Sequence, residues 1–330
     1  MNNFNNMSII QKRFDKSRLR WESNKIGFLI VIALVAANIL AMVMQIIEII
    51  ATGNITGESA KLSASMEFAS IFVMVTAFFI CPLIFCKISK IELNTVLPFK
   101  KVKASEFIAL VFIGLAVCTL SNYACDIIIE EFSLFGISNN IDFSQASDDV
   151  GMNLIAVLST AVEPPLAEEF LFRGVILGVL RRYGDGFAVL MSSVLFGLMH
   201  GNFVQIPFAF IVGLILAFVT VRTNSLLPGM LIHFFNNFLA VFYDILDYNT
   251  DSSTANFIYF VITIATVAIA LLAVFLLCKN KRADFIIKLD SKSDDTLTFK
   301  EKVSCSLLNP GIIIFIALTI FEAVAYLNLT

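Results

Sequence analysis

The sequence carries ionisable and amide side chains inside three apolar stretches, where such groups are rare. Glu168, Glu169 and Arg173 lie in the first stretch, and the chain's only two histidines, His200 and His233, lie in the other two. Burying an ionisable side chain in the middle of a membrane costs several kcal/mol or more, so each one is a candidate functional residue. Carboxylates, imidazoles and amides are the groups that amide hydrolysis needs, because a base must activate water and donors must meet the developing negative charge.

Helical spacing decides which of these side chains can act together. Glu169 and Arg173 are four residues apart and can pair on one helix face, so we interpret them as structural. His233 and Asn237 share a face in the same way and can address one centre. Glu168 points about 100° away from Glu169 and has no partner on its own helix. A lone carboxylate there takes up a proton unless another group stabilises it, and the two histidines could supply that group.

The number of residues between each polar group and the inner end of its stretch indicates that these groups lie at similar depths in the membrane. At about 1.5 Å per helical residue, the side chains lie about 12 to 21 Å into the membrane. Their depths overlap although they come from different parts of the sequence. We therefore predict a single site, and its candidate catalytic residues are Glu168, His200, His233 and Asn237.

The composition places this site in a membrane protein. Of 330 residues, 58% are hydrophobic and only 15% are charged, and the mean hydropathy is +0.87. An average soluble chain is roughly 45–50% apolar and about 25% charged. A water-soluble domain of this size could not bury so much apolar surface, because its exterior must stay polar. We predict an all-α, polytopic transmembrane helix bundle.

Nine apolar stretches are candidate transmembrane helices, since a helix crossing about 30 Å of hydrocarbon needs roughly 20 residues. The fifth is short, and the fourth carries the charges together with Pro164 and Pro165, which could help to open a water-filled cavity. The first is too long for a cleavable signal peptide. The nine candidates are Ile26–Ile50, Ala64–Phe85, Phe107–Ile129, Met152–Leu180, Phe187–His200, Val204–Val221, Leu226–Leu246, Asn256–Cys278 and Gly311–Leu327.

The distribution of Lys and Arg orients the bundle. Six basic residues precede the first span, which predicts a cytoplasmic N-terminus. If the chain crosses the membrane nine times from a cytoplasmic N-terminus, 21 of the 23 basic residues lie on the inner side. The segment 130–150, which then lies on the outer side, has five acidic residues and no basic one. We predict a cytoplasmic segment at 1–25, a transmembrane core at 26–278, a cytoplasmic loop at 279–310 and an extra span at 311–330. The ninth span stays open, because no charged residue follows it.

The polar residues fall into three short motifs. These are Glu168-Glu169-Phe-Leu-Phe-Arg173 (E-E-x-x-x-R), Phe196-Gly-Leu-Met-His200 (F-x-x-x-H) and His233-Phe-Phe-Asn-Asn237 (H-x-x-x-N). In this order and in adjacent spans they resemble the CAAX protease and bacteriocin-processing (CPBP, or Abi) family of intramembrane proteases, which includes the type II CAAX prenyl endopeptidases. The resemblance covers about 70 residues, and none of the motif positions departs from the family's pattern.

The resemblance implies an intramembrane endopeptidase and a role for each residue. Glu168 would be the general base that activates water, and His200 would help to hold that water. His233 and Asn237 would donate hydrogen bonds to the developing oxyanion. Two further residues would brace the helix that carries Glu168, namely Glu169 and Arg173.

Whether a metal takes part is a separate question. Members of this family were first called metalloproteases, and two histidines with one glutamate match the three protein ligands of a catalytic zinc ion. A zinc ion held by Glu168, His200 and His233 is therefore one alternative. The H-E-x-x-H motif of zinc proteases is absent. We favour a metal-free mechanism with no cofactor.

Two other functions are compatible with the same residues. Embedded Glu and His side chains also build proton relays, so a proton-coupled membrane transporter is one alternative. A non-catalytic immunity or assembly protein with the same fold is the other. For a protease of the plasma membrane of a bacterium, the expected partners are membrane lipid and a membrane-associated, prenylated or precursor peptide. The net charge of −3 leaves no basic surface for nucleic acid.

Overall fold

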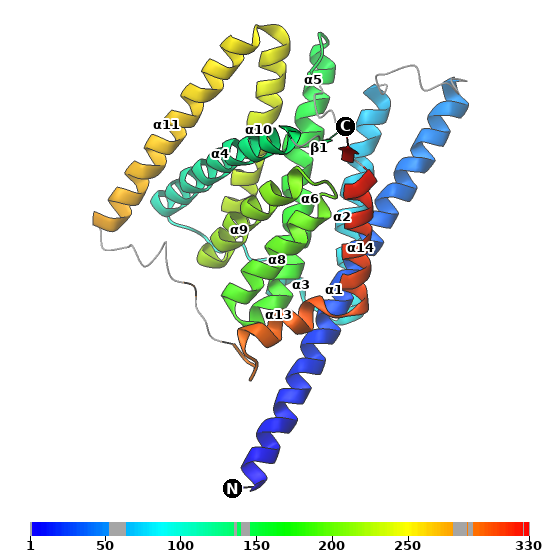
Figure 1. Ribbon diagram of the computed structural model, residues 1–330, viewed down its shortest axis with the longest axis vertical. Helices are drawn as coiled ribbons and strands as arrows, with labels where there is room; N and C mark the ends of the chain where they lie inside the picture. Colours follow the sequence, from blue (N-terminus) through cyan, green and yellow to red (C-terminus); the bar gives the residue numbers. More distant parts are fainter. Residues whose placement is uncertain are drawn as a thin grey trace.

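The computed structural model describes residues 2–52, 64–134, 137–139, 146–279, 289, 293–325 and 327–329 of the chain (Figure 1). These residues form helices and one small two-stranded sheet, which confirms the predicted all-α transmembrane bundle. The elements are α1 (Asn2–Thr52), α2 (Ala64–Ser89), α3 (Leu93–Val96), α4 (Ala104–Leu134), β1 (Ile137–Asn139), α5 (Val150–Ala156), η1 (Val157–Val162), α6 (Glu163–Glu168), η2 (Glu169–Ile176), α7 (Leu177–Leu180), η3 (Arg181–Tyr183), α8 (Asp185–Met199), α9 (Gln205–Thr223), α10 (Leu227–Asn249), α11 (Ser252–Lys279), α13 (Phe299–Leu307), α14 (Pro310–Ala325) and β2 (Leu327–Leu329).

Seven helices of the described residues are long and apolar enough to cross a membrane. An eighth span results if α13 and α14, which meet at an angle of 69°, count as one bent span. The predicted span Phe187–His200 corresponds to α8, which has only 15 residues. At about 1.5 Å per residue α8 measures about 22 Å, which is shorter than the hydrocarbon layer. The chain turns at Gly201, whose φ of +61° suits glycine, before α9 begins.

The motif-bearing span Val150–Tyr183 is one helical rod with two irregular segments. Both η1 and η2 are π-helical, and α6 between them contains Pro164 and Pro165. Proline has no N–H to donate and clashes with the preceding turn, so it disturbs the regular ladder of hydrogen bonds. π-Helical turns are rare and occur frequently at functional sites. Glu168 is the last residue of α6 and Glu169 the first of η2, so both lie where the rod changes geometry.

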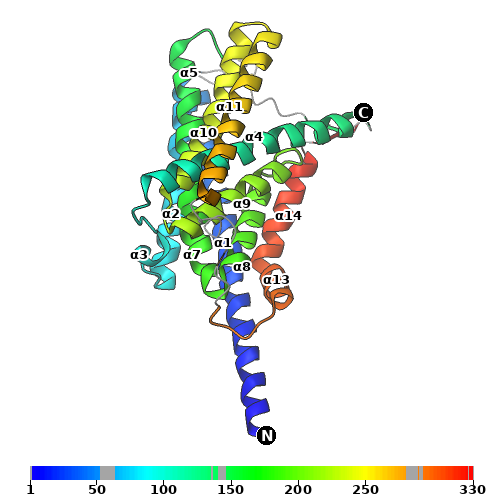
Figure 2. The same ribbon diagram turned by 90° about the vertical axis from the view of Figure 1, so that its left-hand side faces the viewer.

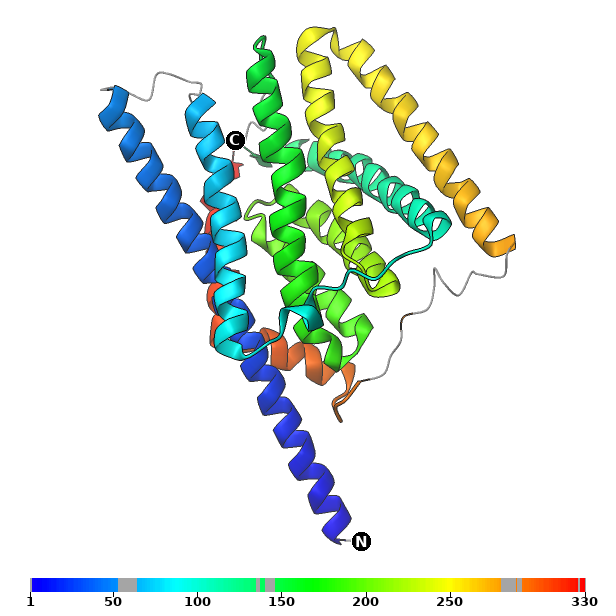
Figure 3. The same cartoon turned by 180° about the vertical axis from the view of Figure 1, so that it is seen from behind.

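The helices form two groups on either side of this rod. α8 and α9 pack against each other as a hairpin, and α4 packs on α9, α10 and α11. Figure 2 shows α4 crossing the other helices at a steep angle rather than running parallel to them. On the other side, α1 packs against α2 and α14. Figure 3 shows from behind how the rod stands between the α1–α2 pair and the α10–α11 pair.

Residues 293–309 contact the first part of α1, which extends far beyond the bundle (Figure 1). Asp15 accepts hydrogen bonds from the backbone N–H and the hydroxyl of Thr296, at 2.9 and 2.8 Å. Glu301 of α13 lies 3.0 Å from Lys12 and 2.9 Å from Lys16. The predicted loop at 279–310 therefore contains a helix fixed to the N-terminal helix, although most of residues 280–292 lie outside the described residues.

Two glycines bring α1 and α14 into close contact. Gly27 lies so close to the backbone of Gly311 that a Cβ atom at either position would overlap the other helix. The side chain of Asn24 accepts a hydrogen bond from the N–H of Gly311 at 2.8 Å. Small residues allow helices in membranes to pack backbone to backbone. At its far end α14 leads to β2, which pairs antiparallel with β1, the strand that follows α4.

Candidate active site

The structure brings the four predicted catalytic residues onto the wall of one cavity of about 560 Å³. Glu168 comes from the end of α6, His200 follows the last residue of α8, and both His233 and Asn237 come from α10. The predicted agreement in depth therefore corresponds to proximity in space. Polar side chains that were not predicted for the site, from α4, η1, α9 and α10, also line the cavity, and they are Asn122, Ser159, Thr160, Gln205, Asn236 and Asp244.

A buried ion pair lies next to the candidate site. Arg173 Nη1 lies 2.8 Å from Glu169 Oε1, and both side chains are fully buried. The guanidinium carbon of Arg173 lies 4.0 Å from the ring centroid of Phe196, which is a cation–π contact. Its Nη2 donates to the carbonyl of Gly213 at 3.4 Å. Arg173 thus joins η2 to α8 and α9.

His233 contacts the two adjacent glutamates. Its Nδ1 lies 3.0 Å from Glu169 Oε1, and its Nε2 lies 3.8 Å from Glu168 Oε2. Because Glu169 is held as a carboxylate by Arg173, Nδ1 must be the donor of the first hydrogen bond. Nε2 can then donate only when the imidazole carries a second proton.

His200 presents an acceptor to the cavity. Its Nδ1 lies 2.9 Å from the carbonyl oxygen of Phe196, one turn earlier in α8. A carbonyl oxygen only accepts, so Nδ1 carries the proton and Nε2 has a free lone pair. The Phe196 ring meets the ring of His200 edge-on at 4.9 Å and that of His233 at 5.9 Å. The aromatic residue of the F-x-x-x-H motif therefore spaces the two imidazoles.

Asn237 is already engaged in the structure. Its Nδ2 donates to the carbonyl of Thr160 at 2.8 Å, and its Oδ1 accepts from Asn236 Nδ2 at 3.0 Å. This amide therefore ties α10 to the π-helical segment η1 and keeps one N–H for another acceptor. Asn236 is a residue that the sequence reasoning missed, although the adjacent Asn-Asn pair of the third motif was a signal for it.

Three buried carboxyl oxygens at or near the cavity accept no hydrogen bond from the described residues. They are Oε2 of Glu168, Oε2 of Glu169, and Oε1 of Glu163, which lies five residues before Glu168 on the same rod. Unsatisfied buried polar atoms are uncommon and require an explanation. Glu168 lines the cavity whereas Glu163 and Glu169 do not, so of the three only Glu168 is placed to meet a water molecule or a substrate there.

The zinc alternative does not fit this geometry. Within the part of the chain that the structure describes, no three His, Cys, Asp or Glu side chains are grouped as metal ligands. The set Glu168, His200 and His233 therefore lines one cavity without converging on a single point. We derive no step through a metal ion. The six cysteines are free thiols.

The structure also gives a position to Glu322, for which the sequence offered no explanation. Glu322 lies on α14 and packs against Gly201, the residue after His200. One turn earlier on α14, the hydroxyl of Thr319 donates to the carbonyl of Leu198 at 3.1 Å. Helix α14 thus contacts the turn that follows His200.

These features define the class of protein. The chain is a multi-pass integral membrane protein with a polar cavity enclosed by its membrane-spanning helices. Residues 150–239 match the family described as type II CAAX prenyl endopeptidase Rce1-like. This segment contains all three motifs and most of the cavity wall, so the comparison confirms the resemblance inferred from the motifs.

Two curated proteins are similar to the chain over about a third of its length. It is 32% identical over 114 residues to the putative membrane peptidase YdiL of Bacillus subtilis, and this covers 34% of the chain and 46% of the relative. It is 32% identical over 115 residues to the membrane-embedded CAAX protease MroQ of Staphylococcus aureus, covering 32% of the chain and 47% of the relative. The chain thus spans about half the length of the curated relatives that it matches. No solved structure matches.

Proposed function

We propose that the protein is an intramembrane endopeptidase that hydrolyses a peptide bond in a membrane-associated or lipidated substrate. The observation that carries the proposal is the Glu168 carboxyl, which lines the same cavity as both imidazoles and has an oxygen that accepts no hydrogen bond from the described residues. The family match and the names of the two relatives support the same reaction. They do not favour a transporter or a non-catalytic protein.

Glu168 and His200 are suited to activate water. A water molecule has two protons, and the Glu168 carboxylate and the free Nε2 of His200 are two acceptors on one cavity wall. With both protons so directed, a lone pair of the water oxygen points at the substrate carbonyl. Glu168 takes one proton during attack and returns it to the leaving amine, as a general base that becomes a general acid.

His233 and Asn237 are suited to meet the negative charge on the carbonyl oxygen. In its protonated form His233 donates from Nε2, and Asn237 has one amide N–H beyond the hydrogen bond to Thr160. Donors fixed in place before the reaction are worth more in a dry cavity than in water. Glu169 and Arg173 touch no reacting atom in this mechanism. They are positioning residues, because Glu169 holds His233 and Arg173 holds Glu169.

The test is a comparison of protein N-termini in membranes of cells that carry the natural chain or a variant. Glu168→Gln keeps the shape of the side chain and removes the base, so N-termini that depend on the protein should disappear. Glu163→Gln is the matched control, since it changes another buried carboxyl of the same rod that does not line the cavity. Unchanged cleavage in Glu168→Gln would overturn the proposal, and loss in both variants would contradict a single catalytic carboxyl.

A further inference from the structure

The cavity extends from the candidate catalytic residues toward one end of the bundle only. On α10 its lining residues begin at His233 and end at Asp244, whereas residues 227–232 contribute none among the described residues. These limits lie about 9 Å from the start of α10 and about 8 Å from its end at Asn249. From His233 the cavity therefore extends along the middle of α10 toward Asn249, and it does not reach the first six residues of the helix.

The other walls show the same direction. On α4 the lining residues are Asn122 and Cys125, both in the second half of the helix. On α9 they begin at Gln205, its first residue, and none follows Val212. On the rod they lie at and before Glu168. On α9 and the rod, the lining residues thus lie toward the end away from the basic residues that close these helices, which are Arg222 for α9 and Arg181 and Arg182 for the rod.

That end is the outer one. Arg222 lies at the end of α9, just before α10 begins, and Arg181 and Arg182 close the rod. Basic residues mark the cytoplasmic ends of transmembrane helices. The helices α8 and α9 also fall short of the outer surface, because α8 is only 15 residues long. Figure 1 shows their connection well below the tips of α5 and α10, which lie at the end opposite the N-terminus.

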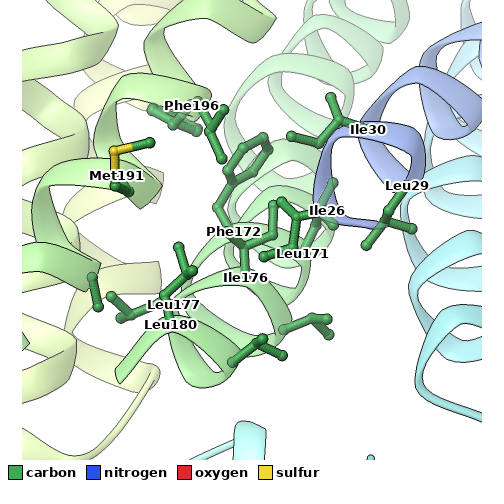
Figure 4. Packing of buried hydrophobic residues seen from close by; sticks show 14 of the residues in the cluster. Ile26, Leu29, Ile30, Leu171, Phe172, Ile176, Leu177, Leu180, Met191 and Phe196 are labelled. Atoms are coloured by element: carbon green, nitrogen blue, oxygen red, sulfur yellow. The ribbon is translucent and has the colours of Figure 1, made fainter. Parts of the chain in front are cut away.

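The inner side has a separate, smaller cavity of about 250 Å³, whose lining includes Arg173, Arg181 and residues 94–100. Beneath the Glu169–Arg173 pair, the rod contributes Leu171, Phe172 and Ile176, all fully buried. Figure 4 shows these side chains packed against α1 and α8. A non-helical connection such as residues 200–204 is tolerated at membrane depth where it lines a water-filled cavity. The connection meets this condition, since His200 and Val204 line the cavity.

The charge of the cavity favours one kind of peptide. Its lining residues include the carboxyl groups of Glu168 and Asp244 and no lysine or arginine. The outer segment 130–150 adds five acidic residues and no basic one. A cleft with low-dielectric walls and charge of one sign concentrates ligands of the opposite sign. The apolar part of the wall, which includes Phe208 and Val212, can take apolar side chains of the same peptide.

We propose that the cavity takes its substrate from the outer side of the membrane, and that this substrate is a peptide segment carrying positive charge. That this peptide is cleaved rests on the proposed peptidase function. The side of entry and the charge preference can be measured without catalysis. A failure of the peptidase proposal in Glu168→Gln therefore leaves this inference standing, and the reverse also holds.

The side of entry is tested by thiol labelling in the full chain with its six cysteines replaced. Ser159→Cys places a thiol on the cavity wall, Ser253→Cys on the outer connection between α10 and α11, and Thr95→Cys at an exposed inner site. A membrane-impermeant cationic methanethiosulfonate should label the first two in intact spheroplasts and Thr95→Cys only after permeabilisation. If Ser159→Cys were labelled only after permeabilisation, as is expected for Thr95→Cys, or only after denaturation, the proposal would be overturned.

The charge preference is tested by comparing a cationic and an anionic methanethiosulfonate of similar size. The ratio of their rates at Ser159→Cys should exceed the ratio at Ser253→Cys by about tenfold, as expected for a focusing cleft. Asp244→Asn should lower the ratio at Ser159→Cys and leave that at Ser253→Cys unchanged. Equal ratios at the two positions would overturn the charge preference, and slower labelling by the cationic reagent would reverse its sign.

Discussion

His233 touches two carboxyl groups that differ by one residue in the sequence, and this double contact makes it central to the site. Through Nδ1 it is bound to Glu169, and through Nε2 it faces Glu168. The two adjacent glutamates are thereby linked through one ring. A change at Glu169 should consequently act on His233 before it acts on Glu168, although Glu169 does not line the cavity.

The two neighbouring asparagines should differ in their effect on cleavage. Asn237→Ala removes a candidate oxyanion donor and should lower kcat by about 10²–10³-fold with little change in KM. Asn236→Ala removes only a partner of Asn237 and should have a smaller effect. Steady-state cleavage of a substrate found by the N-terminal comparison measures both. An equal loss in the two variants would mean that Asn237 acts through packing alone.

Removing one partner of the buried Glu169–Arg173 ion pair should lower the free energy of unfolding more than replacing both partners. Arg173→Met leaves the Glu169 carboxylate without its partner and should lower the free energy of unfolding by about 3–5 kcal/mol. The double variant Glu169→Gln with Arg173→Met buries no unpaired charge and should recover part of that loss. Thermal unfolding in detergent measures the difference. A double variant that is less stable than Arg173→Met would contradict this account.

At the scale of residues, the sequence was sufficient to group the polar side chains but not to give their partners. Periodicity and a rise per residue predicted that Glu168, His200, His233 and Asn237 share a depth, and they line one cavity. The hydrogen bond from Asn237 to Thr160 depends on the local path of a π-helical segment, which no spacing rule contains. Their catalytic roles stay predictions.

At the scale of elements, the early end of α8 has the largest effect on the site. The apolar run Phe187–His200 looks like a short span in the sequence, and composition alone cannot say whether it crosses. In the structure Asn202 accepts hydrogen bonds from the N–H groups of Val204 and Gln205, at 3.1 and 2.8 Å, and so starts α9 inside the membrane. This capping turn holds His200 at the cavity instead of letting α8 continue.

The turn after His200 should not tolerate a side chain. Gly201 has a φ of +61° and lies against Glu322, so Gly201→Ala adds both backbone strain and a clash. We expect it to lower the thermal midpoint and the cleavage rate together. Gly186→Ala is the control, since an added methyl group there meets no atom within 4 Å. Equal behaviour of the two variants, in unfolding and in cleavage, would contradict the proposed support of the turn by α14.

At the scale of the whole molecule, α1, α13 and α14 form a frame around the inner side of the bundle. Charged contacts to Glu301 and a hydrogen bond between Ser23 and Ser306, at 2.9 Å, tie α13 to α1. Lys302 donates to the carbonyl of Tyr183 at 2.6 Å and so ties α13 to the end of the rod. Hydropathy identified the spans, but contacts between residues almost 300 positions apart could not be inferred from one sequence.

Weakening the contacts between α13 and α1 should expose the thiol of Cys305. Cys305 of α13 is only 4% exposed, and Glu301→Gln removes the ion pairs to Lys12 and Lys16. With the other cysteines replaced, Cys305 should react a few-fold faster with a thiol reagent in Glu301→Gln, and high salt should accelerate the natural chain toward that rate. Glu92→Gln, which changes an exposed residue before α3, should have no effect. A salt-insensitive rate would argue against the ion pairs.

The contact between Thr319 and Leu198 joins residues 121 positions apart. A ribosome therefore releases all three motifs into the membrane well before it has made the helix that steadies the turn at Gly201. During that interval the nascent protein contains every polar group of the candidate site, but the turn after His200 lacks its contact with α14. Activity that appears only once α14 has been inserted would protect the cell from cleavage by unfinished chains.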